Sequence, residues 1–257
     1  MYPILFTLFG FQLKTYGLMV TLAFASGIIL AYKRAQNRNL NPDEIMNMST
    51  IIIISAIIGS RILYVLVNPQ QYINDPITVL YIHKGGLVFL GGLLAVIPVI
   101  SWYLTHYKMN YLLWADVMFP SVALGQIFGR FGCFFNGCCY GHETTSSFGI
   151  IFPAIGDGIR HLPTQLFESA ACLVILILLL FIDKKKSKNG YVFASYIFLY
   201  SLWRFFIEFF RGDNRGTWIF NLPVSQFISI FGIIIGIIFL LYLKYGKTEI
   251  DKNGKVA

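Results

Sequence analysis

Residues 165–182 read QLFESAACLVILILLLFI and contain one charged side chain, that of Glu168. A run of this length matches the roughly 20 residues that an α-helix needs to cross the hydrocarbon core of a bilayer. Similar apolar runs recur along the chain, which has 257 residues, 56% of them hydrophobic and 12% charged. Its mean hydropathy is +0.67. The sequence therefore predicts a membrane protein rather than a soluble one.

We count seven such runs, near residues 16–33, 47–67, 86–105, 111–130, 165–182, 191–210 and 219–243. The first run lacks the basic leader and the small-residue cleavage site of a secretory signal peptide, so we expect it to remain as a span. The expected fold is an all-α polytopic membrane protein, with residues 1–257 forming a single integral membrane domain. A periplasmic or extracellular loop region is expected after the fourth helix.

Basic residues are distributed unevenly between the loops. Of the 20 lysines and arginines, 12 stand in every second loop or in the C-terminal tail: Lys33, Arg34, Arg38, Lys108, Lys184, Lys185, Lys186, Lys188, Lys244, Lys247, Lys252 and Lys255. Because cytoplasmic loops carry an excess of Lys and Arg, this pattern predicts an N-terminus outside and a C-terminus in the cytoplasm. We interpret the formal net charge of +8 as a topology signal and a contact with anionic membrane lipids, not as a nucleic-acid-binding surface.

A polar stretch follows the fourth run, where residues 129–141 read GRFGCFFNGCCYG. An ionised side chain at membrane depth costs roughly 2.5–3.5 kcal/mol on insertion scales, so Arg130 marks a candidate site. In the predicted topology, four further ionisable residues share its depth in the outer leaflet: Arg61, Glu168, Arg204 and Glu208. Arg204, Glu208 and Arg211 have the spacing i, i+4, i+7, which places them on one helix face.

Three arginines face two carboxylates in this predicted layer, which leaves an excess of positive charge. An anionic phospholipid head group is the simplest ligand, because the planar fork of Arg donates two parallel hydrogen bonds to phosphate. The alternative is that Arg204–Glu208 and Arg61–Glu168 are ion pairs that only hold helices together. Asp116, near the inner end of the fourth span, is interpreted as a carboxylate at a helix N-terminus.

The chain also resembles the prolipoprotein diacylglyceryl transferase family over nearly its whole length. Six family motifs appear in order, at residues 16–19, 59–64, 85–92, 129–141, 163–168 and 204–211. The resemblance implies transfer of the diacylglyceryl unit of phosphatidylglycerol to the thiol of a lipobox cysteine in a preprolipoprotein, with release of glycerol phosphate. It also implies a bacterial cell (inner) membrane location, with no metal or organic cofactor.

By this resemblance, Arg130 and Arg204 hold the lipid phosphate and stabilise charge on the leaving group. Further functional positions of the family match Tyr16, Asn136, Gly141 and Glu208. Arg61 and Glu168 join the predicted substrate-binding set because they share the depth of Arg130. The predicted set is Arg61, Arg130, Asn136, Gly141, Glu168 and Arg204. The predicted catalytic set is Arg130, Arg204, Tyr16 and Glu208.

Three positions depart from the family pattern. Leu90 stands where the family often has His, Cys133 where it has Asn, and Cys138 where it usually has Glu. That His has been proposed as a base for the acceptor thiol, which with a pKa of about 8.5 is only a few per cent ionised near pH 7. The candidate replacements in this chain are His83, His161 and Glu168.

The departures leave two other functions open. One is a paralogue that moves a lipid unit to a different thiol or hydroxyl acceptor. The other is a non-catalytic phospholipid carrier or scramblase, which an anion-binding layer alone does not exclude. A carrier would need a polar route between the leaflets, and Asp116 is the one ionisable residue predicted deep on the inner side. The pattern therefore favours a transfer enzyme.

Cysteines cluster in the same stretch. Cys133, Cys138, Cys139 and His142 form the pattern C-x4-C-C-x2-H, which is not a standard zinc spacing, so no metal is predicted. An outer location would permit a disulfide between Cys133 and either Cys138 or Cys139. The alternatives are reduced thiols that pack as small apolar groups, and a thiol that takes part in the chemistry.

The predicted topology can be tested by cysteine accessibility. In a variant lacking the native cysteines, a probe cysteine at position 187 should react with a membrane-impermeant reagent only after the membrane is permeabilised. Ser187 lies in the lysine-rich loop that the charge pattern places in the cytoplasm. Labelling of intact cells at this position would refute the topology and the argument from shared depth.

Overall fold

The computed structural model describes residues 3–8, 11–73, 75–81, 85–185, 188–212 and 223–246. These residues contain seven helices that are long and apolar enough to cross a membrane. They are α1 (Thr15–Asn37), α2 (Asp43–Val67), α3 (Phe89–His106), α4 (Tyr111–Asn136), α5 (Thr164–Lys185), α6 (Tyr191–Ile207) and α7 (Val224–Tyr245). The predicted all-α polytopic architecture is confirmed.

The helices overlap all seven predicted spans, with one clear difference in length. The fourth helix continues to Asn136 instead of ending at Arg130, because the apolar residues after Arg130 offer no stop before Gly137. Gly137 adopts a φ of +74°, a left-handed conformation that ends helices. Some residues used in the sequence predictions lie outside the described parts of the chain: His83, Lys186, Ser187, residues 219–222, Lys247, Lys252 and Lys255.

Large apolar side chains cover much of the helix surfaces. Leu94, Ile177 and Ile238 are 59%, 58% and 61% exposed, respectively. In water such surfaces would drive association, whereas in a bilayer they face hydrocarbon chains of similar polarity. The exposed apolar surface therefore agrees with the lengths of the spans.

The chain forms two compact units, which are described separately. The first unit comprises residues 1–31 and 112–257, and the second comprises residues 32–111. The prediction of a single integral membrane domain stays a prediction.

The second unit is built on the close packing of α2 against α3. A Cβ atom on Gly59 would lie 2.5 Å from the carbonyl oxygen of Gly91, so the two backbones leave no room for a side chain. Small residues at such positions permit the close helix contact that replaces the hydrophobic effect in membranes. At the far end of the pair, the Tyr103 hydroxyl donates a 2.6 Å hydrogen bond to Glu44.

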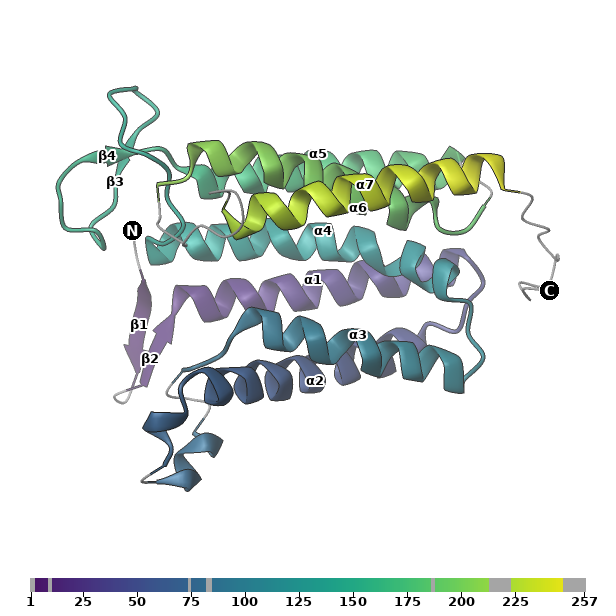
Figure 1. Cartoon of the computed structure of the whole chain (residues 1–257), viewed down its shortest axis with the longest axis horizontal. Helices are drawn as coiled ribbons and strands as arrows, with labels where there is room; N and C mark the ends of the chain where they lie inside the picture. The colour runs from purple at the N-terminus through teal and green to yellow at the C-terminus, as the bar shows by residue number, and fades with distance from the viewer. Residues whose placement is uncertain are drawn as a thin grey trace. The chain divides into compact units, whose positions relative to one another are not determined.

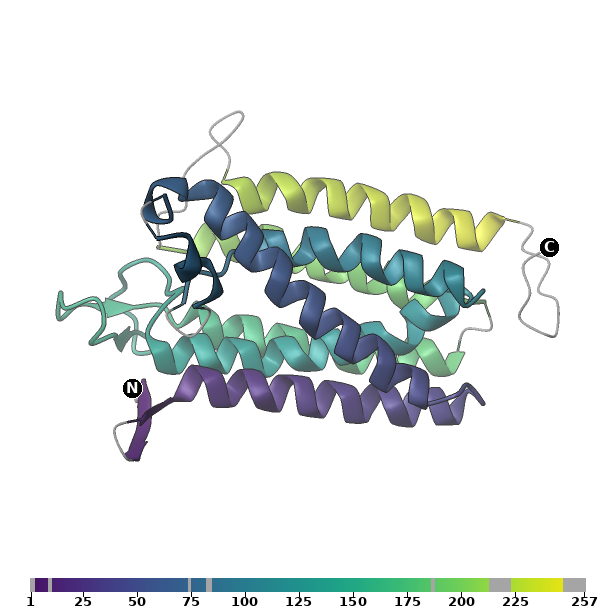
Figure 2. The ribbon, with the colours of Figure 1, turned by 90° about the horizontal axis from the view of Figure 1, so that it is seen from below.

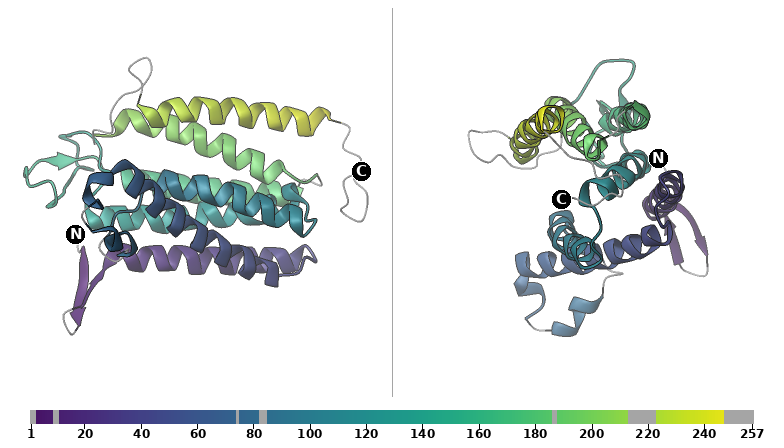
Figure 3. Two further views of the ribbon diagram at one scale, coloured as in Figure 1. Left: turned by 60° about the horizontal axis from the view of Figure 1, so that its bottom comes forward. Right: turned by 90° about the vertical axis from the view of Figure 1, so that its right-hand side faces the viewer.

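In the first unit, α4 packs against both α5 and α6 (Figures 1 and 2). The core comprises residues from these three helices: Ala123, Ile175, Leu176, Leu179, Val192 and Tyr196. Helix α1 meets α4 where Gly27 approaches Ser121, and α7 meets α6 where Gly236 approaches Phe198. The end view in Figure 3 also shows α6 beside α7.

Two small antiparallel sheets lie at one end of the first unit (Figure 1). Strands β1 (Ile4–Leu8) and β2 (Phe11–Lys14) form a hairpin before α1. Strands β3 (Ile150–Ile151) and β4 (Arg160–His161) pair within the long loop between α4 and α5. This end also holds the C-terminus of α4 and the beginning of α5.

Asp116 caps a helix other than its own. It lies inside α4 and is 1% exposed. Its carboxylate accepts hydrogen bonds from the backbone N–H groups of Gly190, at 2.7 Å, and Phe193, at 2.8 Å, at the beginning of α6. These contacts agree with the interpretation of Asp116 as a carboxylate at a helix N-terminus, where it satisfies unpaired N–H groups, and the helix that it caps is α6.

The close approach of α2 and α3 leads to a stability prediction. Gly59→Ala should destabilise the protein by about 1–3 kcal/mol, because the added methyl group must push the two backbones apart. A thermal unfolding curve of the detergent-solubilised protein measures the change.

Gly125→Ala is the matched control. Its Cβ would lie 3.7 Å from the nearest atom, which is ordinary contact, and Ala favours a helix over Gly by about 1 kcal/mol. Equal unfolding temperatures for the two variants would contradict the proposed role of the Gly59 contact.

Candidate active site

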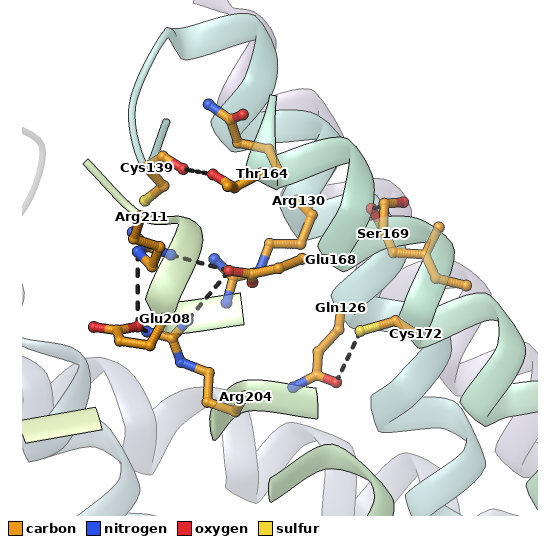
Figure 4. A network of polar contacts seen from close by, with 12 residues as sticks. Gln126, Arg130, Cys139, Thr164, Glu168, Ser169, Cys172, Arg204, Glu208 and Arg211 are labelled. Carbon is orange, nitrogen blue, oxygen red and sulfur yellow. Dashed lines mark hydrogen bonds and ion pairs between the residues drawn. The ribbon is translucent and has the colours of Figure 1, made fainter. Parts of the chain in front are cut away.

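A buried carboxylate, Glu168, is the centre of an arginine network in the first unit (Figure 4). Glu168 lies one turn into α5 and is 2% exposed. Its Oε1 atom accepts hydrogen bonds from Arg211 at 2.9 Å and Arg204 at 3.2 Å. Its Oε2 atom forms an ion pair with Nε of Arg130. One carboxylate thus holds three guanidinium groups.

The three arginines come from separate segments. Arg130 lies on α4 and Arg204 on α6, while Arg211 directly follows the short 3-10 helix η4 (Glu208–Phe210). Arg204 and Glu208 are one helical turn apart and pair with each other, as their spacing predicts. Arg211 follows the helix in extended backbone, so the helix face alone does not bring it to the network. Arg211 was not among the predicted site residues, although its spacing from Arg204 is visible in the sequence.

Glu208 is the second carboxylate of the network. Its Oε2 atom lies 2.8 Å from Nη2 of Arg204 and 3.9 Å from Nε of Arg211. The shorter approach is an ion pair without hydrogen-bond geometry, so this buried oxygen has no hydrogen-bond partner among the described residues. Glu208 therefore neutralises charge here without fixing the guanidinium groups as firmly as Glu168 does.

The network carries a net charge of +1, from three arginines and two glutamates. The side chains of Arg204 and Arg211 are 11% and 2% exposed, whereas that of Arg130 is 20% exposed. Among the described residues, no hydrogen bond or ion pair is made by the two terminal nitrogens of Arg130. Arg130 therefore offers its planar fork to an anion at the most open side of the network.

Arg61 has a different environment, in the second unit. Its guanidinium donates to the carbonyl oxygens of Val79 at 2.7 Å, Thr78 at 2.8 Å and Gly85 at 2.8 Å. The described ion pairs of Glu168 lie within the first unit and do not include Arg61. Within its own unit, Arg61 fastens the loop between α2 and α3.

Backbone pairing with Gly141 positions Arg211 in the network. The two residues form an antiparallel bridge, in which His142 N–H donates to Phe210 and Gly212 N–H donates to Tyr140. A Cβ atom on Gly141 would lie 2.5 Å from the Phe210 carbonyl oxygen. Glycine is therefore needed for this contact between the long loop and the end of α6.

Tyr16 and Asn136 lie near the same end of α4. Tyr16 is the second residue of α1, and its ring packs on Gly132, where an added Cβ would lie 3.1 Å from it. Asn136 is the last residue of α4, next to the cysteine-rich turn. The structure brings Tyr16, Asn136 and Gly141 to the end of the unit that holds the arginine network, and their predicted roles stay predictions.

The candidate replacement bases are occupied where the structure describes them. His161 is buried, and its ring nitrogens contact Asp157 at 2.8 Å and the Gly141 carbonyl at 3.1 Å. The pKa of Asp157 lies below its usual range because the Ile159 N–H and then His161 donate hydrogen bonds to it. The oxygens of Glu168 are engaged by three arginines. Neither His161 nor Glu168 is therefore placed to take a proton from an acceptor thiol.

All four described cysteines are free thiols. The neighbouring thiols of Cys133 and Cys138, together with the Arg211 guanidinium, hold the pKa of Cys139 below its usual range. Figure 4 shows its sulfur beside the Arg211 guanidinium. The cysteine-rich turn and the arginine network therefore adjoin.

Comparison with known proteins gives one consistent result. A relative from Clostridium tetani, named phosphatidylglycerol–prolipoprotein diacylglyceryl transferase, is 40% identical over 242 residues, which cover 92% of this chain and 96% of the relative. A relative from Clostridium perfringens, named as transferase 2 of this kind, is 39% identical over 238 residues, covering 91% of this chain and 92% of the relative.

A third relative, from Clostridium botulinum and with the same name as the first, is 36% identical over 246 residues, covering 93% of this chain and 96% of the relative. The sequence profile of the prolipoprotein diacylglyceryl transferases matches residues 3–242. The chain therefore belongs to the prolipoprotein diacylglyceryl transferase family.

Proposed function

We propose that this protein transfers the diacylglyceryl group of phosphatidylglycerol to the cysteine thiol of a lipobox segment in preprolipoproteins and releases glycerol phosphate. Family membership supports the reaction and both substrates. The observation that carries the proposal in the structure is the open guanidinium of Arg130 in a network of net positive charge. Such a site matches the phosphate of an anionic phospholipid.

In the proposed reaction, the acceptor sulfur attacks the glyceryl carbon that carries the phosphate. The bond between this carbon and the phosphate oxygen breaks, and its electron pair leaves with glycerol phosphate. Charge therefore grows on the phosphate in the transition state, where the guanidinium groups of Arg130 and Arg204 stabilise it. Each guanidinium has five N–H donors, so Arg204 keeps donors for the phosphate beside its contacts with Glu168 and Glu208.

Glu168 orients these arginines. Because it is held by three guanidinium groups and is almost fully buried, it fixes their positions before the substrate arrives. A pre-organised set of donors stabilises developing charge without the cost of reorganisation. We therefore assign Glu168 a positioning role and Arg130 and Arg204 the direct contacts with phosphate.

An apolar groove between α5 and α6 supports a lipid substrate. It has a volume of about 300 Å³ and is lined by residues that include Val174, Leu178, Leu199 and Phe206. Its lining residues Ala171 and Trp203 lie within one turn of Glu168 and Arg204, respectively. An acyl chain in this groove would continue from a head group bound at the arginines.

We also propose that the arginine network faces the outside of the cell, with the N-terminus outside and the C-terminus in the cytoplasm. The charge pattern of the loops supports this orientation. A scramblase is less well supported, because the charged groups of the network gather at one end of the first unit. Asp116, towards the other end of α4, is used to cap α6.

The role of Arg130 can be tested with a lysine substitution. Arg130→Lys keeps the charge but loses the planar fork, so kcat/KM for diacylglyceryl transfer should fall on the order of tenfold to a hundredfold, the equivalent of about 1.5–3 kcal/mol. The assay is mass analysis of a lipobox peptide incubated with phosphatidylglycerol and the purified protein.

Arg160→Ala is the control for a loss of positive charge outside the network, because Arg160 is exposed on β4. It should keep the wild-type rate. Full activity of both Arg130→Ala and Arg204→Ala, in protein that unfolds at the wild-type temperature, would rule out phosphate binding by these arginines.

The absence of His at position 90 leads to a pH prediction. With metals removed by a chelator, the acceptor's own ionisation supplies the thiolate, so the rate should rise about 16-fold between pH 7 and pH 8.5. The family resemblance implies that a His at position 90 points at the acceptor thiol. On that basis, Leu90→His should raise the rate at pH 7 and flatten this profile, because a neutral imidazole accepts the thiol proton. A flat profile in the wild-type protein would show that another group already removes the proton.

A further inference from the structure

Three thiols meet at the end of α4. The sulfur atoms of Cys133, Cys138 and Cys139 all lie within 4.8 Å of one another. All three residues are partly exposed, so an ion from solution can reach the cluster. We call this group the three-thiol cluster. The cysteine spacing in the sequence did not predict a metal site here.

The end of α4 explains why the thiols gather. Gly137 takes the left-handed conformation, with Cys138 N–H donating to Cys133 and Gly137 N–H donating to Phe134. These two bonds define a Schellman motif, in which the side chain after the glycine packs on the side chain five residues earlier. The motif therefore places Cys138 against Cys133.

The third thiol is held by the beginning of α5. The carbonyl oxygens of Cys138 and Cys139 accept hydrogen bonds from Gln165, at 2.6 Å, and Thr164, at 2.7 Å, and both donors are buried. Cys139 has a φ of +65°, a conformation that costs a residue with a side chain on the order of 1–3 kcal/mol. The surrounding contacts therefore impose the turn that directs Cys139 to the cluster.

The geometry suits Zn²⁺. Zinc–sulfur bonds of about 2.3 Å in a tetrahedron place neighbouring sulfurs about 3.8 Å apart, so these thiols need shifts of only about 1 Å. Three protein ligands with an open fourth position are typical of catalytic zinc, whereas structural zinc has four. The cluster supplies three thiol ligands, which is the number typical of catalytic zinc.

The charge balance also favours Zn²⁺. Three thiolates alone carry a charge of −3, and one Zn²⁺ ion reduces it to −1 beside the adjoining arginine network. Arg211 connects the two groups, since it contacts both Cys139 and Glu168. A Cu⁺ ion in the same place would leave a charge of −2.

We propose that Cys133, Cys138 and Cys139 bind one Zn²⁺ ion whose fourth coordination position takes the acceptor thiol of the transfer reaction. The inference rests on the function proposed above, and it assigns the task of ionising this thiol to the metal. A thiol that coordinates zinc is deprotonated. The three cysteines would thereby replace the base that Leu90 cannot supply.

The proposed step is balanced without any oxidant or reductant. The acceptor thiol loses its proton to water when it binds the metal. Its sulfur then forms the bond to the glyceryl carbon, and the phosphate leaves with the electron pair of the broken carbon–oxygen bond. The thioether product is a weaker ligand than the thiolate, so it leaves the fourth position open for the next acceptor.

Metal binding can be measured without any activity assay. Co²⁺, a spectroscopic probe for zinc, should bind the reduced wild-type protein in a 1:1 ratio and give sulfur-to-cobalt charge-transfer absorption that Zn²⁺ abolishes. Cys139→Ser and Cys133→Asn should each lose most of this absorption. Mg²⁺ should not compete, because it prefers oxygen ligands.

Cys172→Ser is the matched control, since Cys172 lies in α5 outside the cluster and contacts Gln126. It should keep the full cobalt absorption. Unfolding temperatures show which variants are folded, and Cys133→Asn introduces the residue usual in the family. The site is refuted if the wild-type protein gives no charge-transfer absorption, or if both cluster variants keep it.

A second experiment tests the fourth position. A lipobox peptide, added without phosphatidylglycerol, should shift the cobalt absorption, while the same peptide with Ser in place of Cys should not. If both peptides leave the spectrum unchanged, the metal does not hold the acceptor, and this part of the inference fails.

Transfer assays separate the inference from the proposed function. Zn²⁺ should raise diacylglyceryl transfer at pH 7 by on the order of tenfold over chelated wild-type protein, and should have no such effect in Cys139→Ser. Equal transfer with chelator and with Zn²⁺ would overturn the zinc inference and leave the transferase function intact. No transfer under either condition, with cobalt binding intact, would overturn the transferase function instead.

Discussion

The site depends on one buried carboxylate that holds three guanidinium groups. Without Glu168, the side chains of Arg130, Arg204 and Arg211 would repel one another in a poorly hydrated space. Removing one partner of a buried ion pair typically costs 3–5 kcal/mol, because the remaining charge is left uncompensated. The helices α4, α5 and α6 are therefore joined by a charged network as well as by apolar packing.

The same network explains the form of the long loop after α4. Arg211 reaches Glu168 only because the backbone around it pairs with the backbone around Gly141. The loop in turn is closed by the short sheet of β3 and β4, and His161 on β4 contacts the Gly141 carbonyl. A region that looks irregular in sequence thus acts as the support of a charged side chain.

Hydrophobic runs were sufficient to predict the seven helices, because span length is a direct response to bilayer thickness. Helix spacing also placed Arg204 and Glu208 together. Which arginines surround Glu168 was not predictable, since topology gives the depth of a residue but not its neighbours across helices. Arg211 was missed for this reason, and Arg61 proved to bind the carbonyls of its own unit.

The cysteine cluster shows the same limit on a smaller scale. The C-x4-C spacing between Cys133 and Cys138 is unusual for a metal site when counted along an extended chain. It becomes a contact once Gly137 ends the helix in a left-handed turn. The end of a helix can thus bring together two cysteines whose spacing along the chain is unusual for a metal site. In the sequence, Gly137 was the residue that indicated this helix end.

The order in which the ion pairs occur along the chain bears on how it enters the membrane. Arg130 and Glu168 lie on consecutive membrane helices, so they can neutralise each other as a hairpin before α6 has been synthesised. Arg204 and Glu208 are one turn apart and pair within a single segment. The charges of the network therefore enter the hydrocarbon region as two neutral pairs, and its surplus cation, Arg211, arrives last, at the end of its helix. Inserting these charges one by one would be costly, and their order along the chain allows most of them to enter the membrane as ion pairs.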